Sequence, residues 1–352
     1  MMKFILLITS FVLGVFSVCS QQAYYSNVNL TLSGMALKAE LSNKISVTHT
    51  NNLSYSQVWS ALKITDLVPG SSTDVYLVYG YDDTDGDVTT DISRNKNSNG
   101  GAVGEWNREH TYPKSLGTPD LGTSGPGADA HMLRSCDVQR NGARGSLKFV
   151  DGTGTSQAVS GGWYPGDQWK GDMARIMMYM YLRYGNQCRP INVGVGASVI
   201  IDPDMIDLFL TWNAEDPVSA YEVTRNDYLA STSNTYGQGN RNPFIDNPYL
   251  ATRIWGGIPA EDIWGTSVSL EELNISSLVT VYPNPTQNEL NITVDDNLEL
   301  EAVSISSMTG QVVYTSTSSI ENEMHIDELE GGFYLVQITT DKGVITKKVI
   351  VN

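Results

Sequence analysis

The spacing of the apolar residues changes once along this 352-residue chain, and that change constrains the fold more than any other feature. Between 167 and 184, large apolar residues recur at steps of three and four, which predicts the buried face of an α-helix. From Val279 onward, apolar and polar residues alternate between turns, as in antiparallel strands with one buried face. The pattern predicts an α+β protein, with a mostly helical domain over 21–262, a linker over 263–278 and a small all-β sandwich over 279–352.

Shorter patterns predict further elements of the first domain. Three more helices are expected, over 54–63, 203–212 and 216–228. Ser54 and Asp216 precede two of these segments and are the residue types that cap helix N-termini. A buried strand is expected over 75–80, where an apolar run ends at a glycine, and a Gly- and Ser-rich loop over 152–167.

The first 20 residues predict a signal peptide. Lys3 gives a positive start, an apolar run follows over 4–18, and small residues precede Gln21. Cys19 lacks the small residue that usually precedes a lipoprotein cysteine, so simple cleavage is favoured. The run is too short for a membrane span and no later stretch qualifies, so none is expected in the mature chain.

Export also permits a disulfide between Cys136 and Cys188, the two remaining cysteines. Two buried free thiols are an equally good interpretation of the same residues.

The net charge of −17 argues at first against a polyanionic partner, but the charge is unevenly distributed. Residues 263–352 contain 13 acidic and 3 basic residues, a net charge of −10. Residues 101–190 contain 8 acidic and 10 basic residues, a net charge of +2. Because nucleic-acid affinity depends on the Lys and Arg side chains at the phosphates, this local excess permits nucleic-acid binding.

The stretch 105–113 contains the strongest candidate for a catalytic site. Glu109 directly precedes His110, and a strand end or turn would let both side chains reach one site. A carboxylate binds hard cations, and a neutral imidazole can take a proton from water. The pair alone is weak evidence, but other polar residues follow within 36 positions of Glu109. They are Asp129, His131, Arg134, Asn141 and Arg144.

Other interpretations of these residues were considered. A zinc site built on His110 and His131 is less favoured, because no third nitrogen or sulfur ligand follows at a typical spacing. A surface-binding protein, an adhesin or glycan binder on an inactive scaffold, would not need a carboxylate, an imidazole and an amide together. The acidic stretch 82–87 could hold calcium, but its spacing does not fit the twelve-residue calcium loop, which favours a solvated turn.

The motifs in the first domain resemble the bacterial endonuclease I family. They are Trp106-Asn-Arg-Glu-His-Thr-Tyr-Pro-Lys-Ser115, Asp129-x-His-x-Leu-Arg134, Asn141-x-x-Arg144, Lys170-Gly-Asp-Met-Ala-Arg175, 212–226 and 238–246. The resemblance spans most of 22–262 and implies a ββα-metal core. It also implies cleavage of DNA, RNA or both to 5′-phosphate ends with one divalent cation, usually Mg²⁺, with Mn²⁺ or Ca²⁺ as alternatives.

The same resemblance implies roles for individual residues. His110 would be the general base, and Glu109 and Asn141 the metal ligands. Ser146 stands where the family commonly has asparagine, and Ser135-Cys136 where Pro-Ser is usual. Neither departure is expected to touch the base or the ligands.

The chemistry of the neighbouring side chains suggests further roles. Asp129 is expected to orient a site residue or a metal-bound water, while His131 either shapes the site or is a structural histidine. Arg134 and Arg144 are candidate phosphate clamps. Arg108, Lys114 and Arg241 are further candidates for nucleic-acid contacts.

The end of the chain resembles the C-terminal sorting domain of type IX secretion substrates. The motifs are Val281-Tyr-Pro-Asn-Pro, Met308-Thr-Gly, Gly332-Phe-Tyr and the final Lys-Lys-Val. The resemblance implies export through the type IX machinery across an outer membrane, with release or attachment at the cell surface. We expect the mature enzyme to be a monomer.

Overall fold

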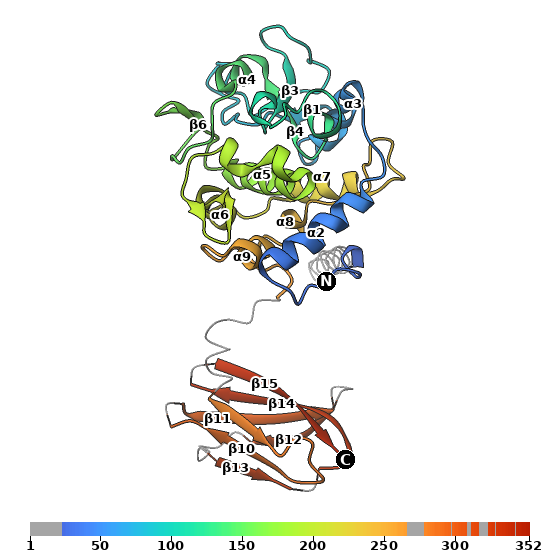
Figure 1. The fold of residues 1–352 in the computed structure, drawn as a ribbon, viewed down its shortest axis with the longest axis vertical. Helices are drawn as coiled ribbons and strands as arrows, with labels where there is room; N and C mark the ends of the chain where they lie inside the picture. Colours follow the sequence, from blue (N-terminus) through green and yellow to red (C-terminus); the bar gives the residue numbers. More distant parts are fainter. Residues whose placement is uncertain are drawn as a thin grey trace, which may run out of the picture. The chain divides into compact units, whose positions relative to one another are not determined.

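Helix α5 (Lys170–Tyr184) lies at the centre of the first of two units in the computed structural model (Figure 1). Every residue from Gly171 to Leu182 is buried, so the apolar stripe is only part of its buried surface. Three helices pack against it. They are α2 (Gly34–Thr48), α6 (Asp207–Glu215) and α8 (Pro243–Asp246).

The two units are formed by Met1–Trp264 and Gly265–Asn352. The structure describes residues 23–265, 278–296, 298–307, 311–316, 323–327, 329–341 and 343–352. The predicted signal peptide, most of the predicted linker and the Met308-Thr-Gly motif lie outside these residues. Among the described helices, none combines the length and apolar character needed to cross a membrane.

Short elements surround α5. The other α-helices within the described residues are α3 (Tyr55–Thr65), α4 (Val138–Arg144), α7 (Ala220–Ala230) and α9 (Tyr249–Trp255). The strands form antiparallel pairs: β1 (Asp74–Tyr76) with β2 (Ser93–Asn95), β3 (Trp106–His110) with β4 (Leu133–Asp137), β5 (Gln157–Val159) with β6 (Gly162–Tyr164), and β7 (Ser198–Val199) with β8 (Asp202–Ile206). Single 3₁₀ turns are η1 (Lys114–Leu116), η2 (Gly125–Ala128), η3 (Gly185–Cys188) and η4 (Pro190–Asn192).

The predicted caps have different outcomes. Ser54 does cap α3, because its hydroxyl accepts the amide of Gln57 while the Gln57 side chain accepts the amide of Ser54. The cap predicted at Asp216 is wrong. Ser219 caps α7 instead, through the same reciprocal arrangement with Glu222. The box of Ser and Glu three residues apart satisfies more amides than a lone acidic cap.

Three other expectations are also corrected. The segment 203–212 is strand β8 followed by α6, because Asp202 to Ile206 pair with β7. The strand expected over 75–80 ends at Tyr76. The loop expected over 152–167 contains the β5–β6 hairpin. These strands depend on pairing with another strand, and the spacing of apolar residues does not encode which segments pair.

The predicted solvated turn at 82–87 agrees with the structure. Asp82 accepts the amide of Thr84 at 2.7 Å, and Asp87 accepts that of Thr89 at 2.9 Å. Asp83 accepts the amide of Ile92 at 2.7 Å. These carboxylates therefore brace their own loop.

The second unit consists of two antiparallel sheets. One has the order β13-β10-β9 and the other β12-β11-β14-β15. Apolar residues of both sheets form a single buried cluster, which confirms the predicted all-β sandwich and the α+β class. The strands are β9 (Val279–Tyr282), β10 (Leu290–Val294), β11 (Leu300–Ser307), β12 (Val312–Ser316), β13 (Glu323–Ile326), β14 (Gly332–Thr340) and β15 (Gly343–Val351).

A buried ion pair joins α5 to α7 in the first unit. Arg175 Nε and Nη2 donate to the two carboxylate oxygens of Glu222 at 2.6 and 2.8 Å, and both side chains are fully buried. Arg225 of α7 donates to Asp66 and to the carbonyl of Leu133 in β4. Helix α7 is therefore tied both to the central helix and to the sheet that contains His110.

We predict that Glu222→Ala destabilises the first unit by about 3–5 kcal/mol, because it removes the carboxylate that makes both short charged contacts with the buried Arg175 guanidinium. Urea unfolding followed by tryptophan fluorescence measures this, since all seven tryptophans lie in this unit. Glu261→Ala, at an exposed position, is the control and should unfold at the wild-type midpoint. Equal midpoints for both variants would contradict the assigned role of the pair.

Candidate active site

Strands β3 and β4 and helix α4 form a compact ββα unit. The strands pair so that Glu109 lies opposite Arg134 and His110 opposite Leu133. Helix α4 follows β4 directly because Asp137 ends the strand and accepts the amides of Gln139 and Arg140. The helix packs against both strands. Asn141 lies on this helix, so it packs close to β3 although it follows Glu109 by 32 positions in the sequence.

A cavity of about 310 Å³ opens at the end of β3. It brings together the three residues expected to carry out catalysis, Glu109, His110 and Asn141. The other residues that line it are Arg108, Pro113, Lys114, Ser115, Asp120, Gly145 and Ser146. Cationic side chains and oxygen donors therefore share one small volume.

His110 is held in its neutral form by the structure around it. Its Nε2 lies 3.0 Å from the carbonyl oxygen of Gly127 in η2. A carbonyl can only accept, so Nε2 carries the proton and Nδ1 keeps its lone pair. Burial lowers the pKa of His110 to about 4, with help from the charges of Lys114 and Arg108 and against the Gly127 hydrogen bond. At neutral pH the side chain is therefore a proton acceptor.

Glu109 is buried beside two hydrogen-bond donors. The hydroxyl of Tyr79 donates to Oε1 at 3.1 Å, and Arg144 Nη1 lies 3.2 Å from the same oxygen. Burial raises the pKa of Glu109 to about 7, although Arg144 and Tyr79 oppose this. Tyr79 has φ = 72°, which is unusual for a bulky residue and places its ring beneath the site.

Asn141 presents an oxygen to the cavity. Its Nδ2 donates to Oδ1 of Asn107 at 2.7 Å, so the amide nitrogen is taken up by β3. The amide oxygen is then the atom available to a ligand. A carboxylate and an amide oxygen in one cavity are the donor types of a hard divalent cation, so these residues fit such an ion.

Comparison with known proteins identifies the family of the chain. Residues 33–249 match the family model described as Endonuclease I. The chain belongs to the endonuclease I family. Residues 280–352 match the model of a secretion system C-terminal sorting domain. Membership of the family makes the chain a nuclease, and the sorting domain makes it a secreted or cell-surface protein.

Two relatives are extracellular ribonucleases from Bacillus. That of Bacillus amyloliquefaciens is 42% identical over 245 residues, covering 66% of this chain and 78% of the relative. That of Bacillus subtilis (strain 168) is 43% identical over 234 residues, which cover 63% of this chain and 75% of the relative. A solved superoxide reductase from Ignicoccus hospitalis aligns with 23% of this chain and 86% of its own chain, at 7% identity and a TM-score of 0.18. This similarity is too low to indicate a shared fold.

Arg144 of this endonuclease I family member does not line the cavity. Its guanidinium is fully buried and donates to the carbonyl oxygens of His110 at 3.1 Å and Thr111 at 2.7 Å. Together with the Glu109 contact, these bonds hold the end of β3. The expected phosphate clamp is corrected: Arg144 positions Glu109 and His110 from behind.

Arg134 and Arg241 are likewise buried away from the cavity of the nuclease. Arg134 is 1% exposed, with Nη2 3.8 Å from Asp172. Arg241 bonds both carboxylate oxygens of Asp246, at 2.7 and 2.8 Å. Charges buried in this way need partners inside the protein, so neither side chain is placed to meet phosphate, and both expectations are corrected.

Asp129 and His131 belong to a network in the core of the nuclease. Asp129 accepts the hydroxyls of Tyr179 and Tyr184, each at 2.8 Å, and an amide hydrogen of Gln238 at 2.9 Å. His131 Nε2 lies 3.1 Å from the carbonyl oxygen of Asn240. Neither residue lines the cavity. The network favours the structural interpretation of His131, and the orienting role of Asp129 stays a prediction.

The cations that do reach the cavity of the nuclease are Arg108 and Lys114. Arg108 is packed between two aromatic rings, its guanidinium carbon 3.4 Å from the centroid of Tyr55 and 4.4 Å from that of Trp59. This stacking fixes a flexible side chain in one orientation. Both residues were predicted to contact nucleic acid, whereas the supporting rings were not identified from the sequence.

Sequence reasoning also missed Ser115, Tyr79 and Gly127. Ser115 lies in the cavity with its hydroxyl 3.0 Å from that of Ser146. Ser146 lines the same cavity as Glu109, His110 and Asn141, and the expectation that it does not touch them stays a prediction. No sequence signal pointed to Tyr79 or Gly127.

The two cysteines are free and buried. Cys136 donates weakly to the carbonyl of Val78, with sulfur and oxygen 3.3 Å apart. Burial raises the pKa of both thiols. The free-thiol interpretation therefore holds for this nuclease, and the disulfide does not form.

We predict that His131→Asn weakens the acid sensitivity of the first unit. Burial lowers the pKa of His131 from 6.5 to about 4. As pH falls from about 6.5 to about 4, unfolded His131 binds a proton that the folded form rejects, so wild-type stability falls. The lost stability is about 3 kcal/mol from this residue. Between pH 7 and pH 4, the free energy of unfolding of the variant should therefore fall by about 3 kcal/mol less than that of the wild type.

Urea unfolding at pH 7, 5 and 4, followed by tryptophan fluorescence, tests the assignment. His325→Asn in the second unit is the matched control and should follow the wild type. An identical pH dependence for His131→Asn and the wild type would show that the buried imidazole is not the titrating group.

Proposed function

We propose that this secreted nuclease hydrolyses phosphodiester bonds with His110 as general base and with one divalent cation bound by Glu109 and Asn141. The observation that carries the proposal is the single cavity at the end of β3 that all three side chains line. Mg²⁺ is the cation that fits best, because one carboxylate and one amide leave most of the coordination shell to water. Mn²⁺ and Ca²⁺ are the alternatives.

The protein side of the reaction follows from the hydrogen bonds of His110. Nδ1 takes the proton of the attacking water, because Nε2 already carries a proton held by Gly127. The Gly127 carbonyl then stabilises the imidazolium that forms and keeps the ring from rotating. The bound cation would neutralise charge at phosphorus and stabilise the leaving 3′-oxygen, which gives 5′-phosphate ends.

Glu109 is suited to bind the cation through its second oxygen. Tyr79 and Arg144 both contact Oε1, so Oε2 is the oxygen that turns to the cation. Because burial raises the pKa of Glu109 to about 7, a bound cation would favour the charged form of this carboxylate. Arg144 keeps the carboxylate in place without occupying the cavity.

Substrate binding falls to Arg108 and Lys114, the two cations of the cavity. Each can contact a phosphate of the chain, and contacts to the backbone carry no base sequence. We therefore propose a largely sequence-non-specific endonuclease. The names of the two Bacillus relatives, both extracellular ribonucleases, favour RNA as the principal substrate over DNA.

The alternative of a catalytically weak surface-binding protein on the same scaffold predicts that the cavity residues have no effect on cleavage. The variants below therefore separate it from the proposal.

We predict that His110→Ala lowers the rate of RNA cleavage by about 100-fold or more, the usual contribution of a positioned base. Folding, measured by the urea midpoint, and nucleic-acid binding, measured by fluorescence anisotropy of a labelled oligonucleotide, should persist. His131→Asn at pH 7 is the matched control, a buried histidine outside the cavity, and should keep most activity. Undiminished cleavage by His110→Ala would rule out this base.

We also predict that chelation abolishes cleavage and that excess Mg²⁺ restores it. Parallel digestions of RNA and of plasmid DNA, with end analysis of the products, measure polymer preference and 5′-phosphate formation together. Glu109→Gln should need far more Mg²⁺ for the same rate, because it removes the charged ligand. Full activity in chelator would contradict a cation-dependent mechanism.

A further inference from the structure

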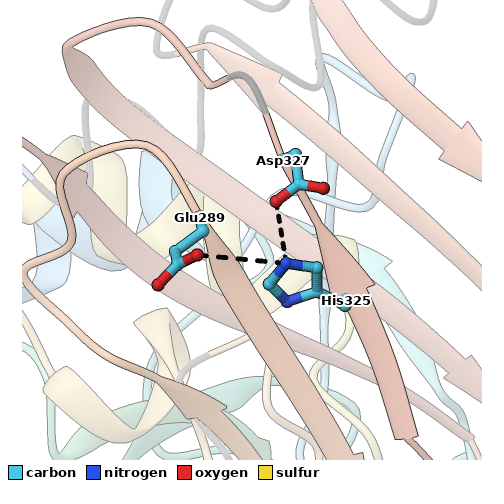
Figure 2. A group of neighbouring side chains, drawn as sticks. All are labelled: Glu289, His325 and Asp327. Atoms are coloured by element: carbon cyan, nitrogen blue, oxygen red, sulfur yellow. Dashed lines mark ion pairs between the residues drawn. The ribbon is translucent and has the colours of Figure 1, made fainter.

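The outward face of the β10–β13 pair in the second unit carries a group of three metal-binding side chains (Figure 2). They are Glu289, His325 and Asp327, and one donor atom from each lies within 4.8 Å of the others. His325 Nε2 is 2.7 Å from Asp327 Oδ1 and 4.0 Å from Glu289 Oε2. Figure 2 shows both carboxylates facing the same nitrogen of the imidazole.

The register of the two strands produces this arrangement. Leu290 pairs with Ile326, and Asn291 pairs with His325. One residue further along, the same register brings Glu289 opposite Asp327. Leu290 and Ile326 are buried, so their neighbours point outward. Two like charges opposite each other across an antiparallel pair are unfavourable unless a positive charge lies between them.

The hydrogen bond of His325 fixes one ring nitrogen and turns the other toward the carboxylates. Nδ1 is 2.7 Å from Oδ1 of Asn291, an amide oxygen that can only accept, so Nδ1 carries a proton. Nε2 lies 2.7 Å from Asp327 Oδ1, so without a cation it donates a hydrogen to that carboxylate, and a bound metal ion would take the place of this hydrogen. An outer hydrogen bond to the second ring nitrogen is typical of metal-binding histidines.

We propose that Glu289, His325 and Asp327 bind one zinc-type divalent ion that joins β13 to β10. One imidazole nitrogen and two carboxylate oxygens suit Zn²⁺ better than Mg²⁺ or Ca²⁺, which prefer oxygen alone. Water fills the fourth position of a tetrahedral site, since about half of each side chain or more is exposed, 49% for His325 and 58% and 65% for the carboxylates. The site is independent of the nuclease reaction.

The ion would stabilise the edge of the sheet. Strand β13 is the outer strand of the order β13-β10-β9 and has four residues. A short edge strand is held to the sheet by few hydrogen bonds. Metal ligands from both strands would therefore add a bond between β13 and β10 at the edge of the sheet. The structure thus assigns the sorting domain a metal site outside the active site.

Zinc binding to the full-length protein tests the proposal. The protein is freed of metal with chelator, and Zn²⁺ is titrated in excess Mg²⁺, which competes at the oxygen donors of the nuclease cavity. All forms are compared in the His110→Ala background, which removes the imidazole of the nuclease cavity. The measured quantity is bound zinc per chain after equilibrium dialysis.

The expected result is that His325→Gln and Asp327→Asn each lose one equivalent of bound Zn²⁺. Glu323→Gln is the matched control, because Glu323 is an exposed carboxylate on the same face of the same strand. It should keep that equivalent. Zn²⁺-dependent protection of the second unit against thermal unfolding, followed by calorimetry, should disappear in the same two variants.

Two outcomes would overturn the proposal. If His325→Gln binds as much Zn²⁺ as its parent, the three side chains are not the ligands, and a protonated imidazole paired with Asp327 accounts for the cluster. If Glu323→Gln loses the same equivalent, general negative charge on the sheet attracts the ion rather than a defined site.

Discussion

The buried guanidinium of Arg144 is the interaction on which the arrangement of the active site depends. It bonds the carbonyl oxygens of His110 and Thr111 and contacts Glu109. A charge with no exposed surface must be paired within the protein, so these contacts are obligatory for the fold. Because β3 ends at His110, the same bonds determine where the base and the carboxylate lie. One side chain that does not line the cavity therefore both supports the fold and holds the two residues proposed for catalysis.

This arrangement divides the basic residues into two groups. Arg134, Arg144, Arg175 and Arg225 are buried and paired with carboxylates or backbone carbonyls, and they hold the core of the nuclease together. Arg108 and Lys114 remain at the cavity, where phosphate can reach them. The division is consistent with a chain of net charge −17 that acts on a polyanion, because the two cations of the cavity act at short range, where the charge of the rest of the chain is screened by salt.

Parts of the fold and site followed from local sequence. The stripe on α5 and the Ser54 cap depend on residues within a few positions of one another, and strand alternation in the second unit does as well. Glu109, His110 and Asn141 were identified because their motifs are short and lie in the order expected of the family. The errors were of another kind. Asp216 has the residue type of a helix cap, but α7 begins after Ser219, which caps it instead. The segment 203–212 has the spacing of a helix, but its first residues lie in β8, which pairs with β7.

The sequence by itself predicted which residues form the proposed site, because the short motifs that contain Glu109, His110 and Asn141 resemble those of the endonuclease I family. Only the tertiary structure decided which of the other polar residues serve that chemistry. Tyr79 reaches Glu109 through a left-handed backbone turn, Gly127 orients His110 from another loop, and Asp129 and Arg134 are drawn into the core. Burial and long-range hydrogen bonds depend on packing between distant segments, and residue type alone does not encode which polar group will be enclosed.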